Sequence, residues 1–262
     1  MRFLRTLVIV VFSVILAGCT RVEPDLKIQL SKQANPWTHL NVNNNPDNFQ
    51  FAIVSDRTGG HRPGVFADAV GKLNLLNPEF VISIGDLIEG YNEDDAKLNQ
   101  QWDEFDGLVN ELRMPFFYVP GNHDISNRVM AEVWNKRLGP SYYHFTYRNV
   151  LFLCLNTEDT CADCISDEQI EYFRKVLEAN GKVRWTLVFM HKPAWRGGAS
   201  DPVWKSWRKI ESLLADRPYT VFAGHTHRYD KATHEGRRYY VLAVTGGSFG
   251  GKEIKIPVNG LL

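Results

Sequence analysis

Five short apolar runs divide this chain, and helical patterns lie between them. The apolar runs are residues 49–54, 80–84, 116–119, 185–190 and 219–223. A strand that is buried on both faces reads as a nearly continuous apolar stretch of this kind. Apolar residues at helical spacing mark residues 65–76, 102–112 and 167–177. This alternation of strands and helices predicts an α/β domain.

The polar residues that follow these apolar runs have side chains that are typical metal ligands. They are Asp56, Asp86, Asn122, His191, and the pair His225 and His227. A single Asp after a strand would be explained by a turn or a helix cap. Functional side chains of an α/β sheet gather where strands end, so five such ends in series predict a shared site. Carboxylate, amide and imidazole groups without thiolates suit zinc, iron or manganese.

The motifs around these residues stand in a recognisable order. They read Asp-Arg-Thr from Asp56, Gly-Asp at Asp86, Gly-Asn-His-Asp around Asn122, a single His191, and Gly-His-Thr-His ending at His227. This order resembles the D-x-H, GD, GNH(E/D), H and GHxH pattern of the calcineurin-like metallophosphoesterases. The resemblance implies a four-layer α/β/β/α sandwich, with two mixed sheets packed face to face and flanked by helices. It also implies hydrolysis of a phosphate mono- or diester by a metal-bound hydroxide.

The resemblance assigns the ligands to two divalent or trivalent ions, which would be manganese, iron or zinc. One ion would be held by Asp56, Asp86 and His227, and the other by Asp86, Asn122, His191 and His225. A pair of ions needs a bridging group, and Asp86 is the candidate for it.

The same resemblance gives His123 the catalytic role of protonating the leaving oxygen or holding the phosphate. An imidazole in this role needs a partner that fixes its tautomer, and Glu89 occupies the place of the acidic partner. The alternative for Glu89 is an exposed loop position. Asp124 is expected to satisfy loop amides rather than to bind metal.

Thr58 departs from the family pattern, because it stands where D-x-H has its histidine. A neutral hydroxyl is a poor ligand for zinc or iron. Three outcomes are open: a water fills the position, His61 swings in beyond Gly59 and Gly60, or the site binds a harder ion weakly. We favour the last, although the hydroxyl could equally cap the following turn. The neighbouring Arg57 is a candidate phosphate donor, with a solvated surface role as its alternative.

The N-terminal segment predicts where in the cell the protein is located. Residues 1–18 have arginines at positions 2 and 5 and contain the apolar stretch 7–16, which is too short to span a bilayer comfortably. The L-A-G-C ending at Cys19 resembles a bacterial lipoprotein box, in which cleavage precedes the cysteine and lipids are attached to it. We therefore expect a lipid-anchored protein of the bacterial cell envelope, on the periplasmic side or at the cell surface.

The rest of the chain is expected to form a tether and one domain. Residues 19–48 would be the lipidated cysteine and a polar tether, with Trp37 as a candidate for docking onto the domain. The phosphoesterase domain would span residues 49–262, either as a compact member with a short second sheet or as a truncated form. The segment 245–248, Thr-Gly-Gly-Ser, is expected to turn close to the site.

Net charge limits the classes of partner that this chain is expected to bind. The 30 Lys and Arg residues equal the 30 Asp and Glu residues and form no basic block, which argues against nucleic acid. A phosphoester small molecule or an envelope component remains as the expected partner, with the membrane reached through the anchor; the oligomeric state is open.

Cys154 is expected to be an inert buried thiol. Cys161 and Cys164 form a C-x-x-C for which we rank a disulfide before free thiols.

Two functions of different classes remain. The first is a lipid-anchored metallophosphoesterase. The second is a catalytically weak or inactive relative that serves as an envelope binding module, which Thr58 motivates. The other ligand positions and His123 are intact, and this favours the enzyme. The segment 195–207 after His191 could form a substrate wall, but the helical spacing of Trp204 and Trp207 favours core packing.

Overall fold

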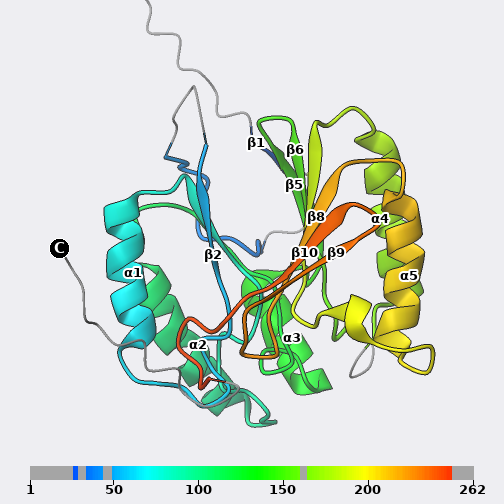
Figure 1. The fold of residues 1–262 in the computed structure, drawn as a ribbon. Coiled ribbons are helices and arrows are strands. Elements are labelled where there is room, and N and C mark those ends of the chain that lie inside the picture. Colours follow the sequence, from blue (N-terminus) through cyan, green and yellow to red (C-terminus); the bar gives the residue numbers. More distant parts are fainter. Residues whose placement is uncertain (1–25, 29–33, 44–48, 160–163, 250–262) are drawn as a thin grey trace, which may run out of the picture.

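Two β-sheets pack face to face, and helices cover both outer faces (Figure 1). The computed structural model describes residues 26–28, 34–43, 49–159 and 164–249. Within them, one buried cluster joins the two sheets, and two further clusters join each sheet to its helices. This arrangement confirms the predicted α/β/β/α sandwich.

The smaller sheet carries the first three predicted strands in the order β2-β3-β4. Its strands are β2 (Phe51–Val54), β3 (Phe80–Ser83) and β4 (Phe116–Phe117). Its helices are α1 (Val65–Leu76), α2 (Asp95–Val109) and α3 (Arg128–Leu138). Both pairs of these strands are parallel, and the bridge between Trp37 and Phe117 at the β4 edge is antiparallel.

The larger sheet is mixed and has seven described strands in the order β1-β5-β6-β7-β8-β10-β9. They are β1 (Leu26–Ile28), β5 (Tyr143–Tyr147), β6 (Val150–Cys154), β7 (Trp185–Phe189), β8 (Tyr219–Ala223), β9 (Asp230–His234) and β10 (Arg237–Val241). Helices α4 (Asp167–Ala179) and α5 (Pro202–Leu214) cover it, with the short η1 (Ala194–Arg196) before α5. The expectation of a short second sheet is wrong, because this sheet has seven described strands. Strand β9 was not expected, since it is a polar edge strand with no apolar run.

Aromatic side chains fill the space between the sheets. Phe80 of β3 is the centre of this cluster, with ring centroids of five aromatic residues within 5.8 Å: Phe51, Phe117, Phe145, Tyr147 and Phe152. Such pairs contribute about 0.5–1.5 kcal/mol each beyond their area burial. The rings therefore fix the two sheets against each other.

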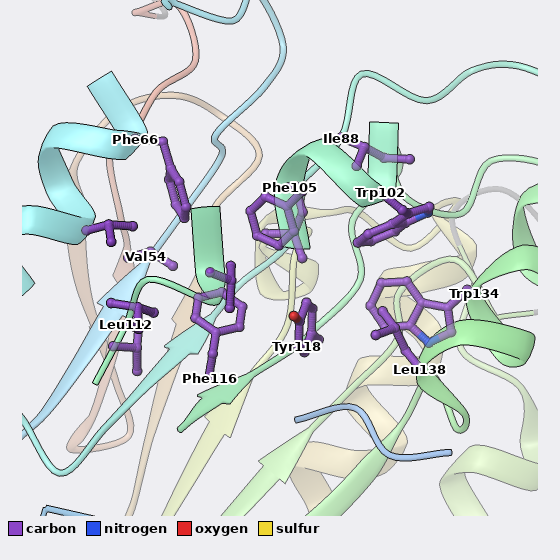
Figure 2. Packing of buried hydrophobic residues seen from close by; sticks show 14 of the residues in the cluster. Val54, Phe66, Ile88, Trp102, Phe105, Leu112, Phe116, Tyr118, Trp134 and Leu138 are labelled. Carbon is purple, nitrogen blue, oxygen red and sulfur yellow. The ribbon is translucent and has the colours of Figure 1, made fainter. Parts of the chain in front are cut away.

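The helices seal the outer face of the small sheet with large buried side chains (Figure 2). Trp102 and Phe105 of α2 and Trp134 of α3 are almost fully buried there. Their rings meet edge to face, with centroids 6.1 Å apart for Trp102 and Phe105 and 5.5 Å apart for Trp102 and Trp134. This packing confirms that the predicted helix around Trp102 serves the core, and it supports the loops that follow β3 and β4.

Parts of the expected tether belong to the sandwich. Strand β1 pairs antiparallel with β5, and Trp37 forms an isolated bridge with Phe117. The Trp37 ring lies 6.2 Å from the rings of Phe117 and Tyr143. Their apolar side chains pack against the cluster between the sheets, so these stretches are held by burial. The predicted signal segment and Cys19 lie outside the described residues.

No helix in the described part of the chain combines the length and the apolar character needed to cross a bilayer.

The cysteines follow the predicted pattern as far as they are described. Cys154 is a free thiol buried in β6, and its burial raises its pKa well above the usual range, so the thiolate is suppressed. Cys164 is disulfide-bonded. Cys161 lies outside the described residues.

Candidate metal centre

The predicted ligands lie in tight turns that follow the strands of both sheets. Four of them have left-handed backbone, with φ of 44° at Asp56, 59° at Asp86, 69° at His225 and 55° at His227. Such residues cost about 1–3 kcal/mol each and cluster at functional sites, where the surrounding structure holds them in place. The turns therefore point these side chains at one another at the cost of backbone strain.

One group of ligand atoms gathers around His191, which is fully buried. Ligand atoms of Asp86, His191 and His225 lie within 4.8 Å of one another. His191 Nε2 lies 3.2 Å from Asp86 Oδ2, 3.1 Å from His225 Nδ1 and 3.0 Å from Asn122 Oδ1. The structure thus brings together all four residues that the resemblance assigned to one ion.

A second group contains Asp56, Asp86 and His227, whose ligand atoms also lie within 4.8 Å of one another. His227 Nε2 is 3.5 Å from Asp56 Oδ1. Asp86 belongs to both groups, which is the position that a bridging carboxylate needs. The geometry therefore matches the predicted division of ligands between two ions.

Backbone carbonyls fix the orientation of two of the imidazoles. His191 Nδ1 lies 2.9 Å from the oxygen of Ile84, and His227 Nδ1 lies 2.5 Å from the oxygen of Ser248. A carbonyl only accepts, so each Nδ1 carries a proton and donates it to the carbonyl. Each Nε2 faces the carboxylates and is the nitrogen that would bind a metal. Metal-binding histidines are commonly oriented by this kind of second hydrogen bond.

The electrostatics of the cluster require positive charge. Asp56 and Asp86 are almost completely buried. Burial raises the pKa of Asp56, with a further contribution from Asp86. Burial also opposes ionisation of Asp86, but His191 outweighs it and lowers the pKa of Asp86 to about 2.

His191 shows the complementary shift. Burial disfavours its charged form, but the Asp86 carboxylate outweighs this and raises the pKa of His191 to about 10. In the metal-free protein, a proton on His191 thus partly compensates a pair of buried carboxylates. A metal cation offers the same compensation with more charge, so the donor set fits divalent ions.

Glycines precede the ligands because the turns leave no room for a side chain. A Cβ on Gly85 would lie 2.7 Å from Gly121 N, and one on Gly121 would lie 2.3 Å from Asp86 Oδ1. A Cβ on Gly224 would lie 2.4 Å from Asp56 Oδ2. These contacts give a steric reason for the glycines of the GD, GNH and GHxH motifs.

Asp124 holds two of the ligand turns together, as predicted. Its Oδ2 accepts from the amides of Asp86 and Gly121, each at 2.8 Å. Its Oδ1 accepts from the amides of Leu87 at 2.8 Å and Ile88 at 3.1 Å. The carboxylate is fully buried and belongs to neither ligand group.

His123 lies beside the bridging carboxylate. Its backbone amide donates to Asp86 Oδ1 at 3.0 Å, and its Nδ1 lies 2.8 Å from the backbone oxygen of Glu89. The sequence prediction assigned the orienting role to the Glu89 carboxylate, and the structure corrects this to the carbonyl. The carboxylate instead accepts from the backbone amide of His61 at 3.2 Å. With Nδ1 engaged, Nε2 is the His123 atom left for a ligand.

Thr58 is fully buried, and its hydroxyl finds no hydrogen-bond partner among the described residues. The hydroxyl therefore does not cap the following turn, which was one of the expectations. Its backbone amide donates to the oxygen of Asp86 at 3.1 Å. His61 belongs to neither group of candidate ligands in the described chain. The position of the missing histidine thus holds an unsatisfied hydroxyl.

Arg57 turns away from the ligands and is neither a surface residue nor placed as a phosphate donor. Its guanidinium bonds Glu104 of α2 and donates to the oxygen of Leu87 at 3.0 Å. It also lies 5.6 Å from the ring centroid of Phe105. The residue therefore attaches the first ligand turn to α2.

The segment 245–248 crosses the first ligand turn, as its glycines predicted. The amide of Thr245 donates to the oxygen of Ser55, and that of Gly247 donates to the oxygen of Asp56 at 2.8 Å. The amide of Ser248 donates to the oxygen of Gly59 at 3.2 Å. Because Ser248 also accepts from His227, this segment links two of the ligand turns.

The segment 195–207 serves mainly packing, which was the favoured expectation. Trp207 is fully buried on α5. The ring of Trp195 lies 5.0 Å from that of Tyr239, and Arg196 pairs with Asp230 of β9.

Tyr91 is a neighbour of the site that the sequence did not reveal. Its hydroxyl accepts from Asn122 Nδ2 at 2.6 Å, and its ring centroid lies 4.7 Å from that of His123. A single tyrosine in an acidic loop carries no spacing or motif signal, so only the folded turn shows this placement.

Comparisons with known proteins agree with this geometry. A family model described as calcineurin-like phosphoesterase matches residues 49–229. A dimetal phosphatase from Danio rerio is similar in structure, with a TM-score of 0.59 and 17% identity, over 75% of this chain and 88% of that one. A purple acid phosphatase from yellow lupin (Lupinus luteus) seeds gives a TM-score of 0.57 and 16% identity, over 82% of this chain and 47% of that one.

A third similar structure is GAP50, the anchor in the inner membrane complex of Plasmodium. Its TM-score is 0.57 at 18% identity, over 79% of this chain and 76% of that one. At these identities the three structures show a shared fold. Comparison with curated protein sequences finds no match.

Proposed function

This chain belongs to the calcineurin-like phosphoesterase family, and we propose that it hydrolyses phosphate mono- or diesters while a lipid on Cys19 holds it at a bacterial envelope. Metal-dependent phosphoester hydrolysis follows from the family and from the ligand set. The observation that carries it is the position of Asp86. This carboxylate belongs to both ligand groups and accepts from the His123 amide.

The residues present fit a pair of ions. Asp56, Asp86 and His227 would hold one ion, and Asp86, Asn122, His191 and His225 the other. When bound, such ions supply positive charge for the phosphoryl oxygens and lower the pKa of a water that can attack phosphorus. A neutral hydroxyl at Thr58 favours a harder ion such as manganese in the first position.

His123 contributes a proton or a hydrogen bond at Nε2. Its Nδ1 is fixed by the Glu89 carbonyl and its amide by Asp86, so the ring has little freedom to turn. In its cationic form Nε2 would donate to a phosphoryl oxygen or pass its proton to the leaving oxygen. General acid catalysis of this kind contributes about 10²–10⁴-fold.

The place where β1 joins the sheet supports an orientation for the anchored protein. Leu26 pairs with Tyr147, and Tyr147 pairs with Val150 at the beginning of β6. The ligands His191 and His225 instead follow the far ends of β7 and β8, which run parallel to β6. A lipid on Cys19, seven residues before Leu26, reaches at most about 25 Å. It would hold the opposite end of the sheet to the membrane and leave the ligands facing outwards.

Turnover tests the hydrolase directly. The soluble form that begins at Thr20 should hydrolyse p-nitrophenyl phosphate or its bis ester after addition of manganese, zinc, iron or magnesium. His123→Ala should lose turnover and keep its metal. Metal binding without any turnover in the unsubstituted protein would favour the envelope binding module instead.

Lipidation is tested separately with the full chain expressed in bacteria. The unsubstituted protein should partition into detergent and carry the mass of acyl chains, and Cys19→Ser should stay in the aqueous phase. Equal partition of both forms would reject the anchor.

A further inference from the structure

Tyr91 is an exposed aromatic residue in a constrained backbone position. Its side chain is 60% exposed, and its φ of 46° lies in the left-handed region that few bulky residues adopt. The preceding Gly90 also has left-handed backbone, with φ of 57°. An exposed ring gains little from burial, so burial alone does not explain this conformation.

Contacts on both sides hold the Tyr91 turn in place. The amide of Gly90 donates to Gln101 Oε1 at 2.8 Å, and the oxygen of Asn92 accepts from Asn127 Nδ2 at 3.1 Å. A Cβ on Gly90 would lie 1.6 Å from the oxygen of His123, so the turn is in direct contact with the GNH motif. Helix α2 and the residue that caps α3 therefore hold the backbone on both sides of Tyr91.

The hydroxyl of Tyr91 sets the orientation of a predicted ligand. It accepts from Asn122 Nδ2 at 2.6 Å, while Asn122 Oδ1 lies 3.0 Å from His191 Nε2. Only the amide oxygen can bind a hard or borderline metal, and the nitrogen must point elsewhere. The hydroxyl holds the amide in the orientation in which the oxygen faces the ligands.

The ring of Tyr91 borders the place where a leaving group would lie. Its centroid is 4.7 Å from the His123 ring, with the planes at 73°. A group whose oxygen meets His123 Nε2 would therefore lie close to the exposed part of the Tyr91 ring. Aromatic pairs gain from such offset or edge contacts.

We propose that Tyr91 is a positioning and specificity residue. Its hydroxyl orients Asn122 toward the metal, and its ring favours phosphoesters whose leaving group carries a planar aromatic ring, such as a phenol or a nucleobase-bearing alcohol. The ring's role rests on the proposed phosphoesterase function, whereas the hydroxyl's role requires only metal binding.

The hydroxyl is tested by titrating metal-free protein with Mn²⁺ and following the heat of binding. Tyr91→Phe should weaken the tighter Mn²⁺ site about tenfold, as loss of an outer hydrogen bond to a ligand commonly does. Tyr229→Phe is the matched control, because Tyr229 is 63% exposed and should keep the original affinity. Equal affinities for Tyr91→Phe and the unsubstituted protein would overturn the positioning role.

The ring is tested by the ratio of kcat/KM for phenyl phosphate to that for cyclohexyl phosphate, since this ratio cancels effects common to both substrates. Tyr91→Leu should lower the ratio about three- to tenfold, the range that one aromatic pair provides. Tyr91→Phe and Tyr229→Leu should keep the ratio. An unchanged ratio in Tyr91→Leu would overturn the specificity role. Absence of turnover in the unsubstituted protein would instead reject the phosphoesterase and with it the ring's role, and the Mn²⁺ titration would still decide the hydroxyl's role.

Discussion

Asp124→Ala should destabilise the protein strongly although it removes no metal ligand. The carboxylate is fully buried and accepts from four backbone amides, those of Asp86, Leu87, Ile88 and Gly121. Each unsatisfied buried donor costs about 1–3 kcal/mol, and entry of water should keep the total for the four amides at the lower end of their summed cost, about 4 kcal/mol. For a domain of this size, each kcal/mol lowers Tm by about 2–4 °C. The expected decrease in Tm is therefore about 8–16 °C.

The assay is thermal unfolding followed by circular dichroism in EDTA, which separates the effect from loss of metal. Asp103→Asn is the matched control, because Asp103 is 70% exposed and pairs with Arg137 at 2.7 Å. Exposed pairs contribute about 1 kcal/mol or less. Asp124→Asn should fall between the two, since its amide keeps one acceptor oxygen but places an NH₂ group against two of the amides. A decrease for Asp124→Ala no larger than that for Asp103→Asn would refute this account of the turn.

Three further predictions concern the same cluster. In EDTA, the ion pair of His191 with Asp86 stabilises the fold fully below about pH 6.5, and this stability is lost as pH rises toward the His191 pKa of about 10. Tm should therefore fall between these values, and Asp86→Asn should reduce that slope; an unchanged slope would reject the pair. Arg57→Met should lower the free energy of unfolding by about 2 kcal/mol, because its charge-assisted bonds are lost, while KM stays constant. A raised KM with an unchanged Tm would show instead that Arg57 binds phosphate. Thr58→Val should raise the stability of metal-free protein by about 1 kcal/mol, because it removes a buried hydroxyl without a partner in the described chain. A lower Tm in EDTA would show that this hydroxyl is satisfied in solution.

Most of the strands and turns that position the metal ligands could be predicted from the sequence. Strands buried on both faces leave continuous apolar runs, and helix α1 was predicted with the bounds that the structure shows. Ligands at the ends of such runs must meet when the strands are parallel neighbours, as β2 and β3 are. The turn at residues 245–248 and the role of Asp124 also followed from residue chemistry.

The remaining features depend on which atom of a residue makes a contact. Glu89 acts through its carbonyl and Arg57 points toward α2, because the backbone turns decide these directions and the residue types do not. Tyr91 is placed by left-handed backbone that follows a left-handed glycine. Strand β9 escaped prediction for another reason: its residues are mostly exposed, so no apolar pattern marks it.

The central claim is that Asp86 joins two ion sites in a working phosphoesterase. The most direct measurement is metal content by mass spectrometry, combined with turnover of bis-p-nitrophenyl phosphate, for the Thr20 form and its Asp86→Asn variant after loading with manganese. We predict close to two ions per chain with turnover for the unsubstituted protein, and loss of turnover together with at least one ion in the variant. Unchanged metal content and turnover in Asp86→Asn would contradict the account.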